Sequence, residues 1–478
     1  MPADGLKTLE VTREAREFMF AFPRRHPGVS AMRVVNGLQV GVLLGAFGVV
    51  VAGLAFRLGA TLLVLNGTLL AFYLVTVAFK AYLMDLSVGA AREMAFTRDE
   101  IAGLPDAALP VYTILVPLYH ERESVEGLLD ALRALDYPKD RLEVIWLLEE
   151  DDAETRHAVS LLSLPRYVRV AVVPDVGPRT KPKACNLGLA LAHGEFLVIY
   201  DAEDRPEPDQ LKKAVLGFQR NEPDVICLQA KLDFYNARQN LLTRWFATDY
   251  AVWFDLFLPG LDHLGGPVPL GGTSNHFRTC ELRALLGWDP YNVTEDCELG
   301  VRLALAGKRT RIIDSTTHEE ACSALGYWVR QRSRWTKGYL QTYLAHQRRP
   351  FALVHALGLR RALSFQVMIG GTFVCLLINP LYWTLTALWF VFRWKAFAEL
   401  FPFPLILWGL LCLFLGNFAF VYAAMLASCK RGFHDLVKYC LLVPVYWCIT
   451  SVGAWRGLVQ LLLRPSHWDK TRHGLAGR

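Results

Sequence analysis

Residues 196–204 read F-L-V-I-Y-D-A-E-D, an apolar run that passes directly into a cluster of acids. A short apolar run of this kind, rich in β-branched and aromatic residues, is typical of a buried strand. The strand-like runs are 111–116, 142–148, 168–173 and 196–200, and the helical patterns between them are 124–132, 154–162 and 184–192. Strands and helices that alternate at this spacing predict a doubly wound, Rossmann-like α/β domain with a parallel sheet.

Long apolar runs flank this domain on both sides. The chain has 478 residues, of which 53% are hydrophobic, and a mean hydropathy of +0.25. A helix needs about 20 residues to cross a bilayer, and the candidate runs are 40–56, 61–79, 365–391 and 404–427. The positions of Arg and Lys beside these runs place the N-terminus, the domain and the tail in the cytoplasm. The sequence therefore predicts a membrane protein whose cytoplasmic domain is inserted between two transmembrane helix pairs.

A fifth apolar stretch, 441–455, allows two interpretations. It is either a fifth span, which puts the C-terminus outside, or an in-plane or re-entrant segment that leaves the tail inside. We favour the second because the stretch is short for a span and contains Pro444. The predicted units are an N-terminal cytoplasmic segment (1–36), a transmembrane hairpin (37–80), the cytoplasmic domain (81–362), a transmembrane helix pair (363–428), an interfacial or re-entrant segment (429–464) and a C-terminal loop (465–478).

Charge and motif patterns argue against several classes of function. The net charge of +6 is mild for this length and gives no case for nucleic-acid binding. The ten cysteines include no C-x-x-C pair, so they indicate small buried side chains in a reducing compartment instead of disulfides or a zinc site. The N-terminus shows no cleaved signal peptide, and the chain contains no G-x-x-x-x-G-K-[ST] phosphate loop.

Polar and acidic side chains follow three of the predicted strands. Ligands bind outside the carboxyl ends of strands in such a sheet, so we expect these side chains to converge on one edge. Neighbouring carboxylates repel one another unless a cation is present, and a divalent metal ligated by their oxygens would hold them while leaving positions for phosphate. The alternative is that they are solvated loop residues or helix N-caps. They are Tyr119 and Glu121 after the first strand, Glu149 and Glu150 after the second, and Asp201, Glu203 and Asp204 after the fourth.

Two helix starts carry further candidate residues. The run from Lys181 to Asn186, which includes Lys183, opens the helix after the third strand, where the charge of a lysine and the backbone donors suit a diphosphate, although surface lysines are common. Thr294, Glu295 and Asp296 open a later helix, with Thr294 as a plausible N-cap. The two acids either favour the helix dipole or supply a general base that takes a proton from an attacking hydroxyl.

The motif Q-x-x-R-W comes shortly before the third apolar run. Gln331, Arg334 and Trp335 offer an amide, a fixed cation and a flat ring. The cation could neutralise a leaving diphosphate and the ring could stack on a sugar. The alternative is a Trp and an Arg that anchor the next helix at the membrane surface.

Together these motifs resemble those of family 2 membrane glycosyltransferases, which include the cellulose, chitin and hyaluronan synthases. The shared pattern is an acidic pair after the second strand, a D-x-D-type motif, T-E-D and Q-x-x-R-W, and it covers about residues 109–335. The resemblance implies a glycosyltransferase-A domain. It also implies that the uridine is lined by Tyr119, Glu121, Glu149 and Glu150, and that the diphosphate is contacted by Lys183, Gln331 and Arg334. By the same resemblance, Asp201 with Glu203 or Asp204 would hold Mg²⁺ or Mn²⁺. Asp296 would be the base, and Trp335 would contact the acceptor sugar.

Two loops complete the resemblance. Gly272, Thr273, Ser274 and His276 occupy the place of a short loop beside the acceptor, and Trp468, Lys470, Thr471 and His473 look like the gating loop that closes over the donor. A gating loop implies a cytoplasmic tail. Glu203 stands where the family usually has a second Asp, and Glu-Glu replaces Asp-Asp after the second strand. The amino-acid sequence around these motifs resembles a bacterial exopolysaccharide branch of the family more closely, and this branch includes proteins linked to phage adsorption and biofilm.

The resemblance implies a processive, inverting enzyme of the bacterial inner membrane. It would polymerise a UDP-hexose, glucose or an N-acetylhexosamine, into a β-linked exopolysaccharide and translocate it. The expected partners are the UDP-sugar, the growing glycan, the lipid bilayer, and export proteins of the periplasm or outer membrane. One alternative is a non-processive enzyme that adds a single sugar to a lipid carrier. An alternative of another class is a non-enzymatic membrane receptor or channel on the same scaffold.

Overall fold

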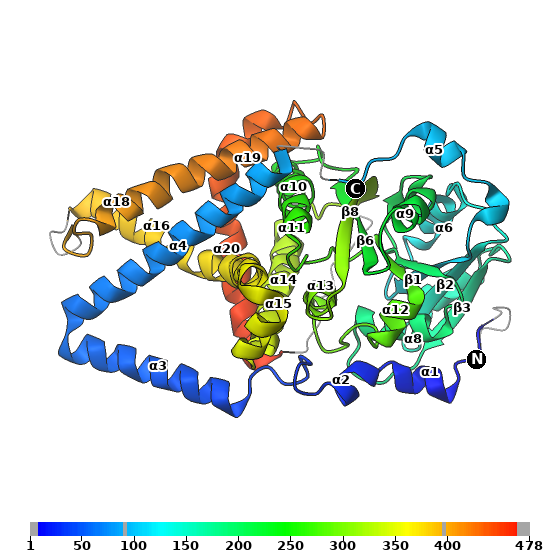
Figure 1. The fold of residues 1–478 in the computed structure, drawn as a ribbon, viewed down its shortest axis with the longest axis horizontal. Helices are drawn as coiled ribbons and strands as arrows, with labels where there is room; N and C mark the ends of the chain where they lie inside the picture. The colour runs from blue at the N-terminus through cyan, green and yellow to red at the C-terminus, as the bar shows by residue number, and fades with distance from the viewer. Residues whose placement is uncertain (1–7, 89–92, 394–397, 466–478) are drawn as a thin grey trace.

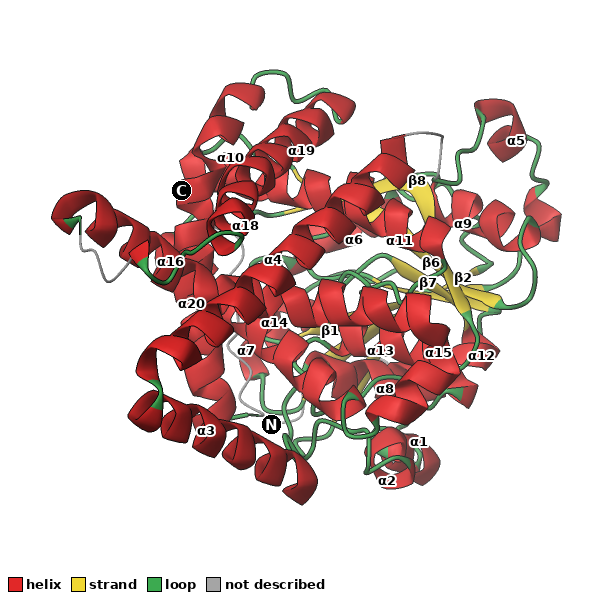
Figure 2. Cartoon of the chain, turned by 60° about the vertical axis from the view of Figure 1, so that its left-hand side comes forward, coloured by secondary structure: helices red, strands yellow, loops and turns green. Residues whose placement is uncertain are grey.

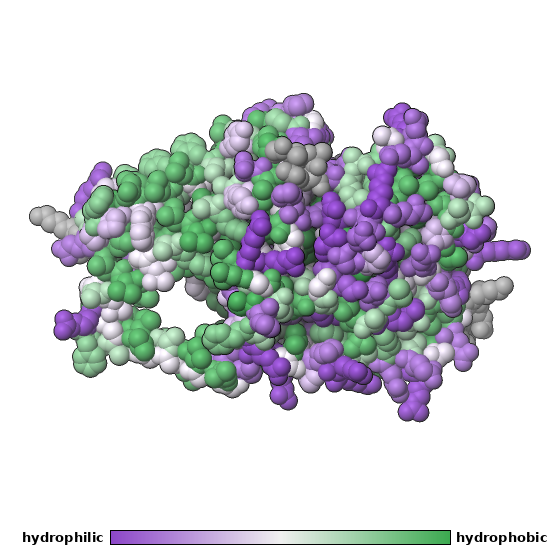
Figure 3. Space-filling view, in the orientation of Figure 1, coloured by the Kyte–Doolittle hydropathy of each residue, from purple (hydrophilic) through white to green (hydrophobic). Residues whose placement is uncertain are grey.

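A computed structural model of the chain describes residues 8–88, 93–393 and 398–465. Figure 1 shows an α/β domain on the right and an arm of long helices on the left. The described residues contain five helical segments that are long and apolar enough to cross a membrane, namely Gly37–Phe56, Leu58–Val88, Pro350–Phe392, Leu405–Lys430 and Val437–Leu463. Hydrophobic side chains cover the surface of the arm, and hydrophilic ones gather over the α/β domain (Figure 3). The predicted membrane-associated α/β architecture is confirmed.

The domain is built on one eight-stranded sheet in the order β3-β2-β1-β4-β7-β6-β8-β5. The strands are β1 (Tyr112–Leu118), β2 (Leu142–Glu149), β3 (Val168–Val173), β4 (Phe196–Ile199), β5 (Arg205–Pro206), β6 (Val225–Phe234), β7 (Asn275–Arg278) and β8 (Arg309–Glu319). All four strand-like runs found in the sequence are strands, and β1, β2, β3 and β4 pair in parallel as predicted. Every side chain of β2 is buried, since helices cover both faces of the sheet.

The sheet is mixed, which corrects the expectation of a wholly parallel one. Strand β7 runs antiparallel to both β4 and β6, and β5 runs antiparallel to β8. Parallel pairing needs a crossover that returns the chain to the edge where the previous strand began. After β6 the chain passes through α10 (Leu241–Val252) and α11 (Leu258–Leu264) and enters β7 from the carboxyl edge. Glycines 271 and 272, just before β7, consequently lie at the edge where ligands bind.

Three helices position the candidate chemistry. Helix α8 (Lys181–Leu191) packs on β1 and β2, and Gly188 allows the close approach because a Cβ there would lie 2.8 Å from a methyl of Leu115. Helix α13 (Glu295–Leu305) contacts both β8 and α14 (Leu325–His346). Helix α14 therefore connects the sheet domain with the helical arm.

The arm contains α3 (Gly37–Phe56), α4 (Leu58–Val88), α16 (Thr372–Phe392), α19 (Asn417–Lys430) and α20 (Val443–Leu463). Helix α3 diverges from α4 beyond the turn that joins them, and none of its residues is buried (Figure 2). Helix α20 has 21 residues, so the premise that the fifth apolar stretch is short was wrong. Helix α20 nevertheless points in a different direction from α16 and α19, which it crosses at a steep angle in Figure 1. Whether it spans or lies in the membrane plane stays a prediction.

Candidate active site

A large cavity, about 850 Å³ in volume, lies at the carboxyl edge of the sheet and continues into the arm. Side chains from the ends of β1, β2 and β4 line its inner part, among them Tyr119, Glu121, Glu149, Asp201 and Glu203. Side chains of α4 and α16 line its far part, among them Tyr73, Asn379, Trp383 and Trp389. One continuous space therefore joins the acidic edge of the sheet to the candidate membrane spans.

Lys181, the first residue of α8, faces the acidic part of the cavity. Its ammonium forms an ion pair with Asp201 and donates a hydrogen bond to the carbonyl oxygen of Gly272 at 2.7 Å. Burial disfavours the charged form, yet the carboxylates of Asp201 and Glu295 raise the pKa of Lys181 well above its ordinary value. Lys181 is therefore a permanent cation at the carboxyl edge of the sheet.

Lys183, which the sequence assigned to a diphosphate, lies behind the cavity. Its side chain is fully buried, and its Nζ donates to Glu149 Oε2 at 2.9 Å and to the carbonyls of Pro174 and Val176, each at 3.2 Å. Lys183 does not line the cavity, and a contact between Lys183 and a diphosphate stays a prediction. Residues two apart on a helix point in different directions, so α8 turns Lys181 to the cavity and Lys183 to the core.

The two acids after β2, Glu149 and Glu150, also point in different directions. Glu149 lines the cavity, and burial raises its pKa even though Lys183 is its ion-pair partner. Glu150 points elsewhere and accepts a hydrogen bond from the backbone of Asp175 at 2.9 Å. The pairing of Glu149 and Glu150 in one ligand site is thus corrected, and Glu150 orders the neighbouring loop.

The acids after β4 form the candidate metal site. Asp201 and Glu203 line the cavity, whereas Asp204 is buried behind them. Asp204 Oδ2 accepts hydrogen bonds from the backbone of Asp201 at 2.7 Å and from the hydroxyl of Thr273. The structure therefore gives Asp204 a role in holding the loop, which corrects its assignment as a possible ligand.

The charges at this edge suit a divalent cation. Burial raises the pKa of Glu203 well above its ordinary value, and the neighbouring Asp201 adds to the shift. Over residues 8–88, 93–393 and 398–465, no cluster of three or more His, Cys, Asp or Glu side chains is arranged to hold a metal. Mg²⁺ is usually bound by one or two carboxylates together with substrate phosphates and water. Asp201 and Glu203 therefore fit Mg²⁺ or Mn²⁺ delivered with a diphosphate.

The T-E-D motif opens α13 at the wall of the same cavity, where all three residues lie. Burial raises the pKa of Glu295 to about 8, with the charge of Asp296 as the next cause. Burial also raises the pKa of Asp296, while Lys181 and Arg334 oppose that shift. Thr294 occupies the N-cap position, but its hydroxyl makes no capping bond, which corrects the expected side-chain cap. Burial therefore raises the pKa of both adjacent carboxyl groups, and Glu295 stays protonated at neutral pH.

The Q-x-x-R-W motif lies on α14, and Gln331, Arg334 and Trp335 all line the cavity. Trp335 lies nearly parallel to Tyr250, with ring centroids 6.1 Å apart and planes inclined by 28°. Within the described part of the chain, the buried Oε1 of Gln331 has no hydrogen-bond partner. An amide oxygen left unpaired in a cavity wall costs free energy until a ligand donates to it.

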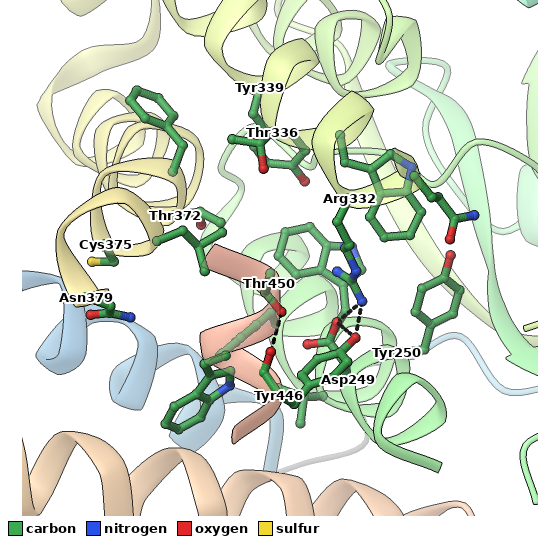
Figure 4. Close-up of a pocket in the computed structure, with 18 of the residues that line it drawn as sticks. Asp249, Tyr250, Arg332, Thr336, Tyr339, Thr372, Cys375, Asn379, Tyr446 and Thr450 are labelled. Atoms are coloured by element: carbon green, nitrogen blue, oxygen red, sulfur yellow. Dashed lines mark hydrogen bonds and ion pairs between the residues drawn. The ribbon is translucent and has the colours of Figure 1, made fainter. Parts of the chain in front are cut away.

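Arg332, inside the motif, ties α14 to two other helices. Its guanidinium donates to Asp249 Oδ2 of α10 at 2.5 Å and to the hydroxyl of Tyr446 of α20, as Figure 4 shows. Four aromatic rings surround it, with centroids 4.6 to 5.5 Å away, those of Phe246, Trp328, Trp335 and Tyr446. The Arg332 guanidinium packs against the Trp335 ring and thereby positions that ring.

The predicted acceptor loop is mostly buried. Gly272 reaches the cavity, but Thr273 Oγ1 donates to the carbonyl of Ile199 at 3.0 Å and the hydroxyl of Ser274 donates to that of Thr317 at 2.7 Å. His276 lies in the core, 2.7 Å from the hydroxyl of Tyr112, and burial lowers its pKa to about 3. Thr273, Ser274 and His276 do not line the cavity, and their contact with an acceptor stays a prediction.

The predicted gating loop, with Trp468, Lys470, Thr471 and His473, lies outside the described residues. The last described residue, Pro465, accepts a hydrogen bond from Gln341 Nε2 of α14 at 3.0 Å. The chain therefore reaches the helix that carries Trp335 just before this segment begins.

Several residues of the cavity wall were missed in the sequence. They are Asp249, Glu319, Arg332 and Tyr446. These residues come from separate parts of the chain, and local sequence carries no signal that they meet. In the run 181–186, which the sequence did single out, the local pattern does not show which of the two lysines faces the sheet edge.

Comparisons with known proteins agree with this geometry. Residues 196–433 match the model of glycosyl transferase family group 2, and residues 113–276 match that of glycosyl transferase family 2. A probable glucomannan 4-beta-mannosyltransferase of Arabidopsis thaliana is 26% identical over 51% of this chain and 48% of its own. A beta-monoglucosyldiacylglycerol synthase of Trichormus variabilis is 28% identical over 50% of each chain. The chain spans about half the length of the curated relatives it matches.

A solved structure shares the fold. The mannosyltransferase PcManGT from Pyrobaculum calidifontis, determined in complex with GDP-Man and Mn²⁺, superposes with a TM-score of 0.53 at 18% identity. The superposition covers 84% of this chain and 99% of that one. These matches favour a glycosyltransferase over a non-enzymatic receptor or channel. Residues 113–276 and 196–433 therefore resemble glycosyltransferase family 2 domains, and the fold is of the GT-A type.

Proposed function

We propose that the protein is a processive, inverting glycosyltransferase that extends a β-linked glycan from a UDP-hexose at the cytoplasmic side of a bacterial inner membrane. The observation that carries this proposal is the continuous cavity from Asp201 and Asp296 to Tyr73 and Trp389 of the arm. A sugar added at the sheet edge has a path lined by aromatic and amide side chains toward the membrane. The resemblance of residues 109–335 to polysaccharide synthases supports a polymer as the product.

The donor half of the cavity suits a nucleoside diphosphate sugar. In this proposal Tyr119, Glu121 and Glu149 line the nucleoside, and Lys181 and Arg334 face the diphosphate. Asp201 and Glu203 would hold Mg²⁺ or Mn²⁺, which when bound supplies positive charge for the departing diphosphate. The GDP-Man and Mn²⁺ bound by PcManGT support the same class of donor and extend the candidates to GDP-sugars.

Asp296 is the proposed base. Its carboxylate would take the proton of the acceptor hydroxyl as the hydroxyl oxygen attacks the anomeric carbon and the bond to the diphosphate breaks. A single displacement of this kind inverts an α-linked donor sugar to a β-linked product. Burial raises the pKa of Asp296, which makes it a stronger base than a solvated aspartate. Lys181 and Arg334 keep compensating charge close to the pair.

The acceptor half begins at Trp335. Its ring, supported by Arg332 and Tyr250, offers a flat apolar surface on which a sugar ring can stack. The Asp249–Arg332 ion pair joins α14 to α10, so the ring is held from two sides. This fixed platform would keep the terminal sugar of a glycan within reach of Asp296.

A second candidate function has its own support. The far part of the cavity is lined by apolar side chains of the arm, including Leu70, Leu376 and Leu413, which suit the chains of a lipid. One relative is a beta-monoglucosyldiacylglycerol synthase. On this interpretation the enzyme adds one sugar to a lipid acceptor and releases it.

The test is to incubate the purified full-length protein with Mg²⁺ or Mn²⁺ and radiolabelled donors, and to measure product length and linkage. The donors are UDP-glucose, UDP-N-acetylglucosamine, UDP-N-acetylmannosamine and GDP-mannose. We expect products of many sugars from one UDP-hexose, and a single addition would establish the second candidate instead. Asp296→Asn should reduce transfer by about 10³-fold or more while UDP still binds, because it removes the base but no donor contact. An Asp296→Asn protein with wild-type turnover would refute the assignment of the base.

A further inference from the structure

Lys80 places a charge in the wall of the cavity within the arm. It belongs to α4, and its Nζ lies 5.6 Å from the ring centroids of both Phe257 and Phe420. Among the described residues of the candidate spans, Lys80 is the only Asp, Glu, Lys or Arg that lines this cavity. Ionisable side chains inside membrane segments are costly, so one that faces a cavity indicates a ligand.

The position of Lys80 corresponds to the cytoplasmic end of the membrane region. Helix α4 has 31 residues and is therefore about 46 Å long, whereas the hydrocarbon core of a bilayer is about 30 Å thick. The end of α4 packs on the cytoplasmic domain, since a Cβ on Gly260 would lie 2.5 Å from the carbonyl oxygen of Leu83. Ser87 of the same turn donates a hydrogen bond to the carbonyl of Leu256. Lys80 lies about one turn before Leu83 and about two turns before Ser87, so in the proposed orientation it would stand near the lipid head groups.

The charge of Lys80 is not neutralised by the protein around it. In the part of the chain that the structure describes, no carboxylate lies within ion-pair distance of its ammonium. The carboxylate of Asp249 interacts electrostatically with Lys80, but it already accepts a hydrogen bond from Arg332 at 2.5 Å. Two aromatic faces attract a buried cation, but they carry no compensating charge. The site consequently favours an anion.

We propose that Lys80, between Phe257 and Phe420, binds the phosphate of a lipid from the cytoplasmic leaflet. The apolar wall formed by Leu70 and Val77 of α4 and by Leu413 would receive its acyl chains. Figure 3 shows an opening through the molecule between α3 and α4, beside the other helices of the arm. The inference rests on the proposed function only for the membrane orientation. It names lipid phosphate as the ligand class, carried either by an acceptor or by a lipid that does not react.

The experiment measures lipid binding by the purified full-length protein without any donor sugar. Native mass spectrometry would follow titration with dioleoyl phosphatidic acid, with dioleoylglycerol, which lacks the phosphate, and with inorganic phosphate alone. We expect the phosphatidic acid to bind at least tenfold more tightly than dioleoylglycerol, and Lys80→Gln to remove that preference. Lys80→Arg should retain it because the charge remains. Lys438→Gln is the matched control, since Lys438 is exposed, lies 5.2 Å from one ring and does not line the cavity.

The outcomes separate this inference from the proposed function. Equal binding of phosphatidic acid by wild type and Lys80→Gln would overturn the site, and so would equal binding of the two dioleoyl lipids. Inorganic phosphate that displaces phosphatidic acid at equal concentration would overturn the lipid as its source. A sugar label that appears on the bound lipid after UDP-sugar is added identifies an acceptor. Binding without label identifies a lipid that does not react, and both results support the site. Failure of sugar transfer alone counts against the proposed function and leaves the binding result intact.

Discussion

Glu295 and Asp296 are adjacent acids whose burial sets how the site responds to pH. Burial raises the pKa of Glu295 to about 8 from an ordinary 4.5, so its carboxyl is protonated at neutral pH. The folded protein then binds this proton more tightly than the unfolded chain. Because of that difference, the contribution of Glu295 to the free energy of unfolding falls as pH rises from about 4.5 to about 8.

Glu295→Gln should copy the protonated state and remove this pH dependence. We expect the variant to keep sugar transfer within about threefold of wild type at pH 7, because a neutral side chain already stands there. Its melting temperature should change less than that of wild type between about pH 5 and pH 8. Thermal unfolding at a series of pH values checks this.

Glu298→Gln provides the contrast, because Glu298 is ionised. Its carboxylate accepts hydrogen bonds from Arg302, 2.8 Å away, and despite burial this partner helps hold the pKa of Glu298 at about 2. Removing that charge leaves a buried guanidinium without its partner and should cost about 3–5 kcal/mol at pH 7. If Glu295→Gln instead melted with the same pH dependence as wild type, Glu295 would not be the group that titrates.

Two glycines, Gly338 and Gly457, allow helix α14 to pack closely against its neighbours beside the candidate site. A Cβ on Gly338 would lie 2.7 Å from the Cβ of Thr294, directly before the T-E-D acids. A Cβ on Gly457 of α20 would lie 2.6 Å from the carbonyl oxygen of Ser333, within Q-x-x-R-W. The absence of a side chain at these positions therefore sets the spacing between Asp296, Trp335 and α20.

Gly338→Ala should impair transfer more than it impairs folding. The overpacking costs about 1–3 kcal/mol, and the better helix propensity of Ala recovers about 1 kcal/mol. We expect at least a tenfold loss of turnover, because Thr294 and the adjacent acids must shift, with a fall in melting temperature of only a few degrees. Gly326→Ala on the same helix is the control, since nothing lies within 4 Å of the added Cβ. Equal turnover for the two variants would contradict the proposed coupling of α14 to T-E-D.

At the scale of the whole molecule, the topology depends on α20. The segment Val437–Leu463 is long and apolar enough to cross a membrane. Its course across α16 and α19 in Figure 1, and its packing along α14, support a helix in the membrane plane. With four spans, the tail after Pro465 lies on the same side as the catalytic domain.

A protease-cleavable tag at the C-terminus tests this topology. In sealed inside-out vesicles we expect the protease to remove the tag, because the cytoplasmic face is outermost. The same tag placed after Arg57, in the turn between α3 and α4, should be protected and serves as the control. A C-terminal tag protected as fully as the one at Arg57 would show that α20 spans.

The sequence alone determined the strands of the parallel half of the sheet, the apolar helices, and the motifs around Asp201, Asp296 and Trp335. Each of these is a local pattern, since strand and helix periods, span length and turn position are read within a few residues. Because strands β1 to β4 pair in parallel, their carboxyl ends lie at the same edge of the sheet. For that reason the acidic edge could be predicted.

Only the tertiary structure decided which members of each motif reach the cavity. The rotation of α8 selects Lys181 over Lys183, and the antiparallel entry of β7 buries His276 against Tyr112. Arg332 meets Asp249 and Tyr446 across separations of 83 and 114 residues. Such contacts depend on how helices and strands pack over long distances along the chain, and no local pattern encodes them. The physical reason is that a side chain's direction is set by its own helix or strand, whereas its surroundings are set by all the others.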